Sequence, residues 1–350
     1  MKIPGRLSFC QTNHRLIEFH PMKAIQIHEF GGPEVLTWEE IPDPVPAQDE
    51  VLLEVKAASI NHLDIWIRKG LPGVKLPRIL GCDAAGIAEG KRVLLNPATS
   101  CGTCEFCTVG NMPMCRQYAI WGEHKNGTDA QYLAVPRHAL IPIPDEISFE
   151  EAAAAPLVFV TSWRMLMTRG RLQPSEDVLI WSAGGGVGTI CIQMAKVAGA
   201  CVFATASSDE KCARLKELGA DHVFNHEKED VVRKVKEITG KRGVDLVVDY
   251  TGKDTWARSL KVARKGGRIV TCGATSGFDP AEDLRHIFFR QLEIIGCTMG
   301  NNKELQDALR LLFTGQVRPI IHGTFPMSEV AEAHKQIESR KVFGKLILTP

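Results

Sequence analysis

The sequence lacks three features that define large classes of proteins. Its longest apolar run, Ala152 to Val160, is broken by Pro156 and is shorter than the roughly 18–20 residues that span a bilayer. Lys and Arg number 42 against 41 Asp and Glu, so no excess of positive charge indicates a nucleic-acid surface. The 11 cysteines are an odd number and follow no visible signal peptide, which argues against a disulfide-stapled secreted scaffold. We therefore expect a cytoplasmic protein that binds a small-molecule substrate and neither a membrane nor nucleic acid.

The chain changes its pattern along its length. At roughly 100–200 residues per domain, 350 residues allow two domains. Residues 1–21 show no hydrophobic period, and we expect a disordered extension before Met22, with a weak transit peptide as the alternative. Residues 22–150 contain short strand-like runs between turn signals, for example 50–57, 91–96 and 130–135, which predicts a β-rich domain.

Residues 151–299 alternate between strand-like and helix-like segments. Ser148 and Glu151 fit a capping box that begins the first helix. Strands are expected at 177–183, 201–206, 245–250, 267–274 and 292–298. Helices are expected at 188–198, 209–218, 228–239 and 254–264. This alternation predicts a doubly wound parallel sheet, the α/β architecture of a Rossmann domain.

A glycine-rich turn follows the strand at 177–183. It reads Ala183-x-Gly185-x-x-Gly188, with Gly186 and Val187 between, and a helix follows at once. Small residues let the backbone approach a pyrophosphate, which then lies at the helix N-terminus. We expect these five residues to bind a dinucleotide; the alternative is a turn that only packs helix against strand.

The end of the second strand bears on the choice of dinucleotide. NAD enzymes place a carboxylate there for the ribose 2′-hydroxyl, whereas this chain has Ala206-Ser207-Ser208. Ser207, Ser208 and Lys211 are suited to a 2′-phosphate, so we favour NADP over NAD. In the alternative interpretation Ser208 is a helix cap and Lys211 a solvated residue. We also place Cys272 and Gly273 in the cofactor site.

Four cysteines form the most specific motif in the chain: Cys101, Cys104, Cys107 and Cys115. Their spacing within one loop suits tetrahedral Zn²⁺, and four protein ligands leave no open position, so this zinc would be structural. A lobe at 96–116 would hold the ion. An iron–sulfur cluster or redox-active thiols are the alternatives, although the common bacterial cluster motif has a shorter last gap.

The combined motifs resemble the medium-chain dehydrogenase/reductase family, in its branch of zinc-binding alcohol dehydrogenases and quinone oxidoreductases. The resemblance covers Met22 to Pro350 and rests on "GGPEVL", "INHLDIWIRKG", "ILGCDAAG", the cysteine lobe, "AGGGVG", "VDLVVDYTG", "GGRIVTCGATSG" and "GCTMG". It implies a GroES-like catalytic domain formed by 22–150 and 300–350, a Rossmann domain at 151–299, and a site between them. It also implies a homodimer or homotetramer, paired through an edge strand near 292–298.

Two departures from the family pattern affect the expected chemistry. The positions that hold a catalytic zinc in the alcohol dehydrogenases fall at Asn61, Cys82 and Leu157, with Asp83 at a neighbouring glutamate position, so we expect this zinc to be lost. Asn61 and Asp64 resemble the N-x-x-D of metal-free quinone oxidoreductases. About a dozen family residues are absent after Gly90, which indicates either a shortened loop or a variant with a damaged barrel.

We therefore expect an NADPH-dependent oxidoreductase that transfers hydride to a small carbonyl, enone or quinone and carries one structural zinc. Asn61, through its amide N–H, and Thr161 are the candidate hydrogen-bond donors to substrate, and Asp64 is expected to orient its neighbours. The alternatives are an alcohol dehydrogenase with an atypical catalytic zinc and a catalytically impaired variant.

Overall fold

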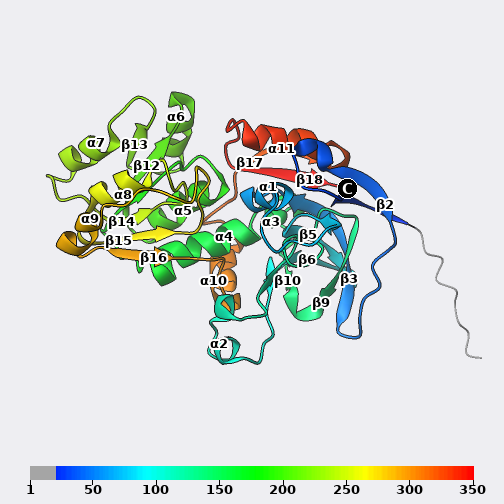
Figure 1. The fold of residues 1–350 in the computed structure, drawn as a ribbon. Coiled ribbons are helices and arrows are strands. Elements are labelled where there is room, and N and C mark those ends of the chain that lie inside the picture. The colour runs from blue at the N-terminus through cyan, green and yellow to red at the C-terminus, as the bar shows by residue number, and fades with distance from the viewer. Residues whose placement is uncertain (1–20) are drawn as a thin grey trace, which may run out of the picture.

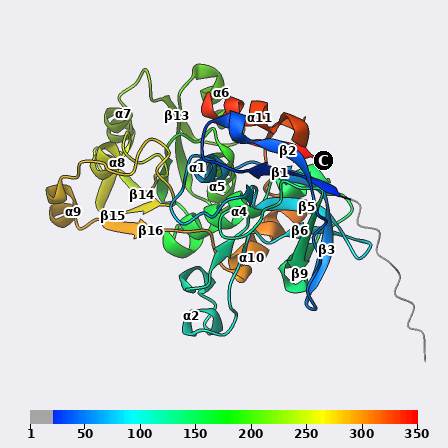
Figure 2. The same ribbon diagram turned by 45° about the vertical axis from the view of Figure 1, so that its right-hand side comes forward.

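The chain folds into two halves with a cavity between them. The computed structural model describes residues 21–350, so the predicted extension lies outside the described residues except for Pro21. Figure 1 shows a half built on a parallel sheet at the left and a β-rich half at the right, and Figure 2 gives the same arrangement after a 45° turn. The predicted combination of a β-rich domain and a doubly wound parallel sheet is confirmed. None of the helices among residues 21–350 is long and apolar enough to cross a membrane.

The β-rich half contains a sheet of seven strands and two smaller sheets. The large sheet has the order β10-β6-β5-β3-β18-β17, with β9 also paired to β3. Its strands are β3 (Glu50–Ser59), β5 (Asp83–Ala88), β6 (Lys91–Leu95), β9 (Tyr132–Pro136), β10 (Leu140–Pro142), β17 (Ile321–Pro326) and β18 (Lys345–Thr349). The smaller sheets are β2-β1-β4 (Thr37–Ile41, Met22–Ile27, Arg78–Ile79) and β7-β8 (Ala98–Thr99, Ala119–Ile120). The helices of the β-rich half are α1 (His62–Arg68), α2 (Glu105–Thr108), α3 (Phe149–Ala153) and α11 (Val330–Glu338).

The shortened segment after Gly90 forms a tight hairpin. Ala88 pairs with Lys91, so Glu89 and Gly90 alone connect β5 to β6. Both have positive φ angles, +50° and +75°, as a type I′ turn requires, and glycine adopts such an angle without a steric cost. The sheet continues through β6 to β10 without interruption. The structure therefore shows a shortened loop in an intact sheet and not a damaged barrel.

The parallel sheet has six strands in the order β13-β12-β11-β14-β15-β16. They are β11 (Asp177–Ile180), β12 (Cys201–Ala206), β13 (His222–Asn225), β14 (Val244–Val248), β15 (Ala263–Thr271) and β16 (Glu293–Gly296). The helices are α4 (Pro156–Trp163), α5 (Gly186–Val197), α6 (Asp209–Glu217), α7 (Val231–Ile238), α8 (Trp256–Val262), α9 (Leu284–Arg290) and α10 (Asn302–Phe313), and a π-helical turn spans Arg164–Arg169. The five predicted strands and four predicted helices are present, whereas β13 and α9 were not predicted.

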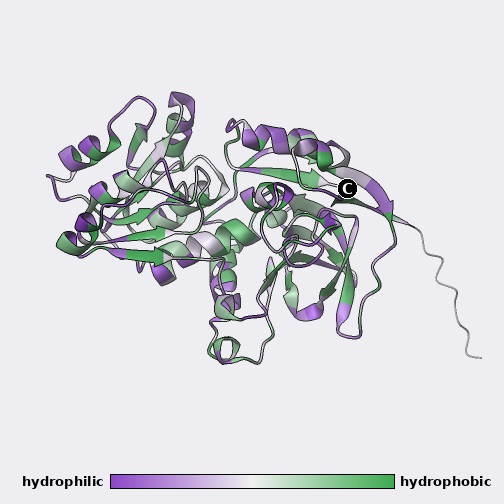
Figure 3. Ribbon diagram, in the orientation of Figure 1, coloured by the Kyte–Doolittle hydropathy of each residue, from purple (hydrophilic) through white to green (hydrophobic). Residues whose placement is uncertain are grey.

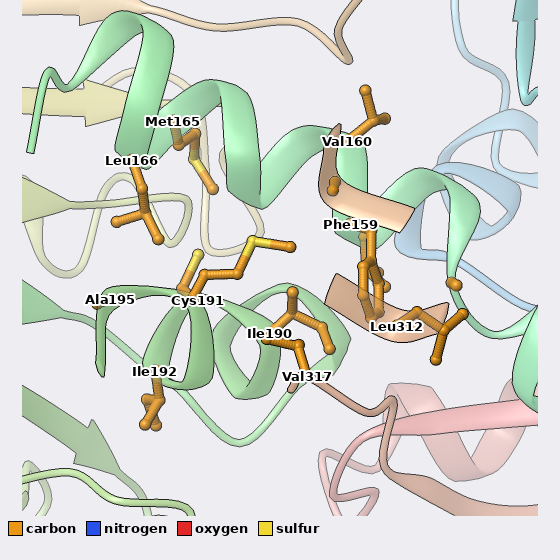
Figure 4. Packing of buried hydrophobic residues seen from close by; sticks show 14 of the residues in the cluster. Phe159, Val160, Met165, Leu166, Ile190, Cys191, Ile192, Ala195, Leu312 and Val317 are labelled. Carbon is orange, nitrogen blue, oxygen red and sulfur yellow. The ribbon is translucent and has the colours of Figure 1, made fainter. Parts of the chain in front are cut away.

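Alternating side chains of the parallel sheet bury two separate cores. Val178 and Ile180 of β11 face α4, α5 and α10, whereas Leu179 and Trp181 face the side of α7 and α8. This two-sided burial produces the continuous apolar runs from which the sheet was predicted. Figure 3 shows hydrophobic strands inside and mostly hydrophilic outer faces on the helices. Figure 4 shows part of the first core, where Phe159, Ile190 and Leu312 come together.

A buried ion pair joins two helices at the junction of the halves. Arg164 follows α4, and its guanidinium lies 2.8 Å from a carboxylate oxygen of Glu304 in α10. A second nitrogen of Arg164 donates to Asn111 of the cysteine lobe at 3.3 Å. Arg164 and Glu304 are 8% and 5% exposed. Removing one partner of such a pair leaves a buried charge without compensation.

We predict that Glu304→Gln lowers the free energy of unfolding by about 3 kcal/mol, because the Arg164 charge stays buried. Urea-induced unfolding measures this change. The matched control on the same helix is Asp307→Asn, which removes the solvent-exposed pair with Lys303 and should cost less than about 1 kcal/mol. Equal effects of the two substitutions would contradict the role given to the buried pair.

Candidate functional site

A cavity of about 540 Å³ lies between the two halves. This volume is within the range of about 300–1,000 Å³ that is usual for small-molecule sites. Helices α1 and α4, the glycine-rich turn, the ends of β12 and β15, and the segment before β18 all contribute to its wall. The cavity thus joins every part of the chain in which site residues were predicted, apart from the cysteine lobe.

The glycine-rich turn lies at one end of this cavity. Gly185 caps α5, and Gly185, Gly186 and Val187 line the cavity wall. Ala183 and Gly188 lie behind it: a Cβ on Gly188 would be 2.4 Å from the Tyr250 hydroxyl and 2.5 Å from the Ala183 Cα. Gly188 therefore allows helix and strand to pack closely, and the other three present backbone to the cavity at a helix N-terminus, where an anion is favoured.

The segment before β18 is tied directly to this turn. The Gly344 N–H donates to the Gly184 carbonyl at 2.8 Å, and Gly344 has a φ angle of +94°. The next residue, Lys345, passes over Gly186, where a Cβ would be 2.7 Å from the lysine Cδ. Glycine at 186 therefore leaves room for the lysine to extend into the β-rich half.

The Lys345 ammonium lies in a buried polar cluster on the far side of the turn. It donates to Asn61 Oδ1 at 2.6 Å and to the Ile60 carbonyl at 2.9 Å, and lies 3.5 Å from Asp83 Oδ2. Asp83 also accepts from Asn61 Nδ2 at 2.9 Å and from the Leu157 N–H at 2.9 Å. The side chains of Lys345 and Asp83 are 4% and 0% exposed. The ammonium is thus surrounded by the positions at which a catalytic zinc was expected to be lost.

This cluster changes the role predicted for Asn61. Its amide nitrogen donates to Asp83, with Ser59 O and Cys82 Sγ each at 3.5 Å, and its amide oxygen accepts from Lys345. One amide hydrogen therefore has a short bond to Asp83, whereas the other has only the two contacts at 3.5 Å. Asn61 borders the cavity and also positions Lys345 and Asp83, and its role as a donor to substrate stays a prediction.

Two further carboxyl groups lie behind the cluster. Asp64, within α1, accepts from the Asn61 N–H at 2.7 Å and from the Gly81 N–H at 3.2 Å, and it does not line the cavity. Burial raises the pKa of Asp64 to about 6. Asp129 is 1% exposed, its oxygens have no hydrogen-bond partner among residues 21–350, and burial raises its pKa well above the usual value. Burial therefore favours the neutral form of Asp129 and opposes the accumulation of negative charge in the cluster.

Hydroxyl and imidazole groups complete the wall near this cluster. Thr161 borders the cavity, and among residues 21–350 its hydroxyl has only the Met299 sulfur, at 4.0 Å, as a weak partner. His62 borders it too, and burial lowers the pKa of its imidazole. The buried Tyr118 hydroxyl has no partner among residues 21–350. Tyr118 was not predicted, because it lies in a loop whose path the sequence does not specify.

The residues predicted for a 2′-phosphate lie beside the glycine-rich turn, where a Cβ on Gly184 would be 3.4 Å from the Lys211 Cδ. Ser207 and Lys211 line the cavity, whereas Ser208 does not and instead caps α6 by accepting from the Lys211 N–H. The Lys211 ammonium donates to the carbonyls of Arg340 and Val342 at 2.7 and 2.8 Å. These contacts use two of the three Lys211 ammonium hydrogens and the acceptor side of the Ser208 hydroxyl, so the alternative interpretation of Ser208 as a cap is observed, while the phosphate role of Ser207, Ser208 and Lys211 stays a prediction. Cys272 and Gly273, which were predicted to belong to the cofactor site, both line the cavity.

Two residues missed in the sequence lie at the same end. Arg340 lines the cavity and has no ion-pair partner within residues 21–350. Glu227 lines it as well, and follows the unpredicted strand β13. A carboxylate is therefore present at this rim, although the Ala206-Ser207-Ser208 segment contains none. The only sequence signal for either residue was its charge.

The cysteine lobe brings its four sulfurs together. They lie within 4.8 Å of one another, and the Sγ atoms of Cys107 and Cys115 are 3.9 and 3.5 Å from that of Cys101. Four sulfurs at about 2.3 Å from one ion are about 3.8 Å apart, so the arrangement fits tetrahedral zinc. Backbone N–H groups of Thr103 and Cys104 lower the pKa of Cys101 to about 6, which favours the thiolate. In the part of the chain from 21 to 350, this is the one group of three or more His, Cys, Asp or Glu side chains placed so that they could hold a metal ion.

Family comparisons cover both halves of the chain. A family described as "Alcohol dehydrogenase GroES-like domain" matches residues 47–145, and one described as "Zinc-binding dehydrogenase" matches residues 186–314. The first falls on the β-rich half and the second on the parallel sheet with α10.

Individual proteins match over nearly the whole chain. A NAD-dependent alcohol dehydrogenase and an acryloyl-coenzyme A reductase, both of Sulfurisphaera tokodaii, are each 31% identical to this chain. Each alignment covers 94% of this chain and 100% of the relative. A quinone oxidoreductase of Salmonella typhimurium is 32% identical, with 93% of this chain covering 99% of it. A solved NAD-dependent alcohol dehydrogenase superimposes with a TM-score of 0.91 at 41% identity, over 94% of this chain and 100% of that one. The chain therefore belongs to the medium-chain dehydrogenase/reductase family of oxidoreductases, in its branch of zinc-binding alcohol dehydrogenases and quinone oxidoreductases.

Proposed function

We propose that this enzyme uses NADPH to reduce a small substrate in which a C=C bond is conjugated to a carbonyl, such as an enone or a quinone. The observation that carries the proposal is the Lys345 cluster, which places an ammonium among Asn61, Asp83 and Leu157. When bound, the dinucleotide supplies the hydride. The protein supplies the turn at Gly185–Val187 for its pyrophosphate and a cavity for the substrate beside it.

A catalytic zinc does not suit this cluster. Leu157 offers only its backbone, and Asn61 offers an amide, which is a poor zinc ligand, so only Cys82 of the three positions carries a good ligand. A doubly charged ion about 4 Å from an ammonium is repelled by about 8 kcal/mol at an effective dielectric constant of about 20. A zinc-dependent alcohol dehydrogenase is therefore the weaker candidate, and it would need Lys345 to leave the cluster.

The relatives support conjugated substrates. Several are named for substrates in which a double bond adjoins a carbonyl or carboxyl group: acryloyl-coenzyme A reductase, 2-haloacrylate reductase and quinone oxidoreductase. Others are named NAD-dependent alcohol dehydrogenases, which supports the second candidate. The lack of zinc-ligating side chains at Asn61 and Leu157 favours the first.

The choice of NADPH rests on the charge at the rim of the cavity. Arg340 is available to a 2′-phosphate, Ser207 adds a hydroxyl, and Lys211 fixes the backbone of the segment that carries Arg340. Glu227 opposes a phosphate, so the preference depends on Arg340 prevailing.

We predict that Arg340→Ala reduces the affinity for NADPH about tenfold relative to NADH, because a charge-assisted contact to the phosphate is lost. Glu227→Gln should shift the ratio towards NADPH, since it removes a repelling charge. Fluorescence titration of both dinucleotides measures the constants, with Lys216→Ala on the outer face of α6 as the control. Equal losses for NADPH and NADH in Arg340→Ala would refute the proposed basis of the preference.

We further propose one zinc per chain, held by the cysteine lobe. Cys104→Ser should abolish zinc binding and lower the melting temperature, because the ion joins segments of a loop with little core of its own. Cys82→Ser is the matched control and should leave the zinc content at one per chain. Elemental analysis by mass spectrometry of both variants decides this: loss of zinc in Cys82→Ser would indicate a second, catalytic site.

Subunits are proposed to pair along the free edge of β16. Ile294 of this strand is 39% exposed, and Phe288 and Phe289 of the neighbouring α9 are 59% and 71% exposed. Exposed apolar side chains beside an unpaired strand edge are typical of an interface. Light scattering should give a dimer or tetramer for the protein and a smaller particle for Ile294→Lys, with Val109→Lys in the cysteine lobe unchanged. A monomeric unsubstituted protein would contradict this assembly.

The proposed activity is tested by following NADPH oxidation with 1,4-benzoquinone or trans-2-hexenal, and NADP reduction with ethanol, in separate assays. Reduction of the first two by a preparation with one zinc per chain supports the proposal. Oxidation of ethanol by a preparation with two zinc ions per chain would support the alcohol dehydrogenase instead. Tight NADPH binding without turnover of any substrate would indicate an impaired enzyme.

A further inference from the structure

The ammonium of Lys345 has one hydrogen that the protein leaves weakly bound. Two of its three hydrogens are in short bonds, to Asn61 Oδ1 at 2.6 Å and to the Ile60 carbonyl at 2.9 Å. The remaining contact, to Asp83 Oδ2, is 3.5 Å long. That carboxylate oxygen already accepts from Asn61 at 2.9 Å and from the Ser59 hydroxyl at 3.2 Å. The third N–H is therefore the one most easily given to another acceptor.

Lys345 lies where the glycine-rich turn meets the part of the cavity wall formed by Asn61, Leu157 and Thr161. The residue lines the cavity, and its stem lies against Gly186 at the N-terminal turn of α5. Asn61, Leu157 and Thr161 line the same wall. The ammonium is thus next to the dinucleotide turn and next to the wall that a substrate would contact.

A nearly complete burial strengthens its electrostatic effect. The side chain is 4% exposed, so water screens its charge poorly. Donors that are already in place where negative charge develops are worth more than donors in water, because they need no reorganisation during the reaction. The long contact to Asp83 keeps the lysine in position without satisfying its last hydrogen.

We propose that Lys345 is the electrophile of this active site and donates a hydrogen bond to the substrate carbonyl oxygen as that oxygen gains charge. The proposal rests on the proposed function. The β-carbon of the substrate gains a hydride, two electrons and one hydrogen, from the reduced dinucleotide, which is thereby oxidised. The π electrons of the C=C bond shift to form an enolate, whose oxygen accepts the Lys345 hydrogen bond. A proton from water then completes the product, which is the saturated carbonyl compound from an enone and, after tautomerisation, the hydroquinone from a quinone.

The test is Lys345→Met, which keeps the length of the side chain and removes its charge. The expected result is a 10²- to 10³-fold lower kcat with 1,4-benzoquinone and trans-2-hexenal, as for loss of one oxyanion donor. The dissociation constant of NADPH should change less than threefold. The melting temperature should fall, because Asp83 loses its counter-charge. Lys341→Met, an exposed neighbour outside the cavity wall, is the control and should retain full activity.

A double variant separates chemistry from stability. In Lys345→Met with Asp83→Asn the cluster carries no buried charge pair, and the Asn61 amide is free to turn over and bond Asn at 83. The melting temperature should therefore recover towards that of the unsubstituted protein, while kcat remains at least 10²-fold low. Recovery of both would show that the lysine only stabilises the fold and would overturn the proposal.

Two other outcomes are distinguishable. If Lys345→Met alone keeps more than a third of the activity, Lys345 is not the electrophile, although the proposed reductase function stands. If the unsubstituted protein oxidises NADPH with neither probe, the proposed function fails and the role of Lys345 fails with it.

Discussion

The buried ammonium of Lys345 is the interaction on which the organisation of this site depends. A charged group at 4% exposure requires acceptors, and the protein supplies them from Asp83 in β5, from the Ile60 carbonyl directly after β3, and from Asn61. Because Gly344 is bonded to Gly184, the same segment fixes the dinucleotide turn relative to the β-rich half. The cavity, its polar cluster and its glycine turn are thereby parts of one connected unit.

The same cluster contains few buried charges other than the Lys345 ammonium. Asp83 accepts from Asn61 and the Leu157 N–H and lies 3.5 Å from the Lys345 ammonium, while burial raises the pKa of Asp129 and so favours its neutral form. Where a metal-dependent relative would need thiolate and imidazole ligands, this chain has an amide, a single cysteine and a leucine. Asn61 and Leu157 leave a metal without ligands, and Asn61 at the same time accepts a hydrogen bond from the Lys345 ammonium.

The sequence was sufficient for the features that arise from local patterns. The alternation of apolar runs predicted five strands of the parallel sheet, the Ser148–Glu151 capping box was confirmed, and the cysteine spacing predicted the cluster of four sulfurs. β13 was missed because its four residues carry too little apolar pattern, and with it the carboxylate of Glu227. Lys345, Arg340 and Tyr118 were missed because only the return of the chain end and the path of a loop bring them to the cavity.

The central claim is that an ammonium, and not a zinc ion, occupies the catalytic cluster, and anomalous X-ray scattering at the zinc edge tests it most directly. A crystal of the zinc-loaded enzyme should give one anomalous peak per chain, among Cys101, Cys104, Cys107 and Cys115. The Lys345 ammonium should lie between Asn61 and Asp83 with no peak beside it. A second peak next to Cys82, with Lys345 displaced, would contradict the account.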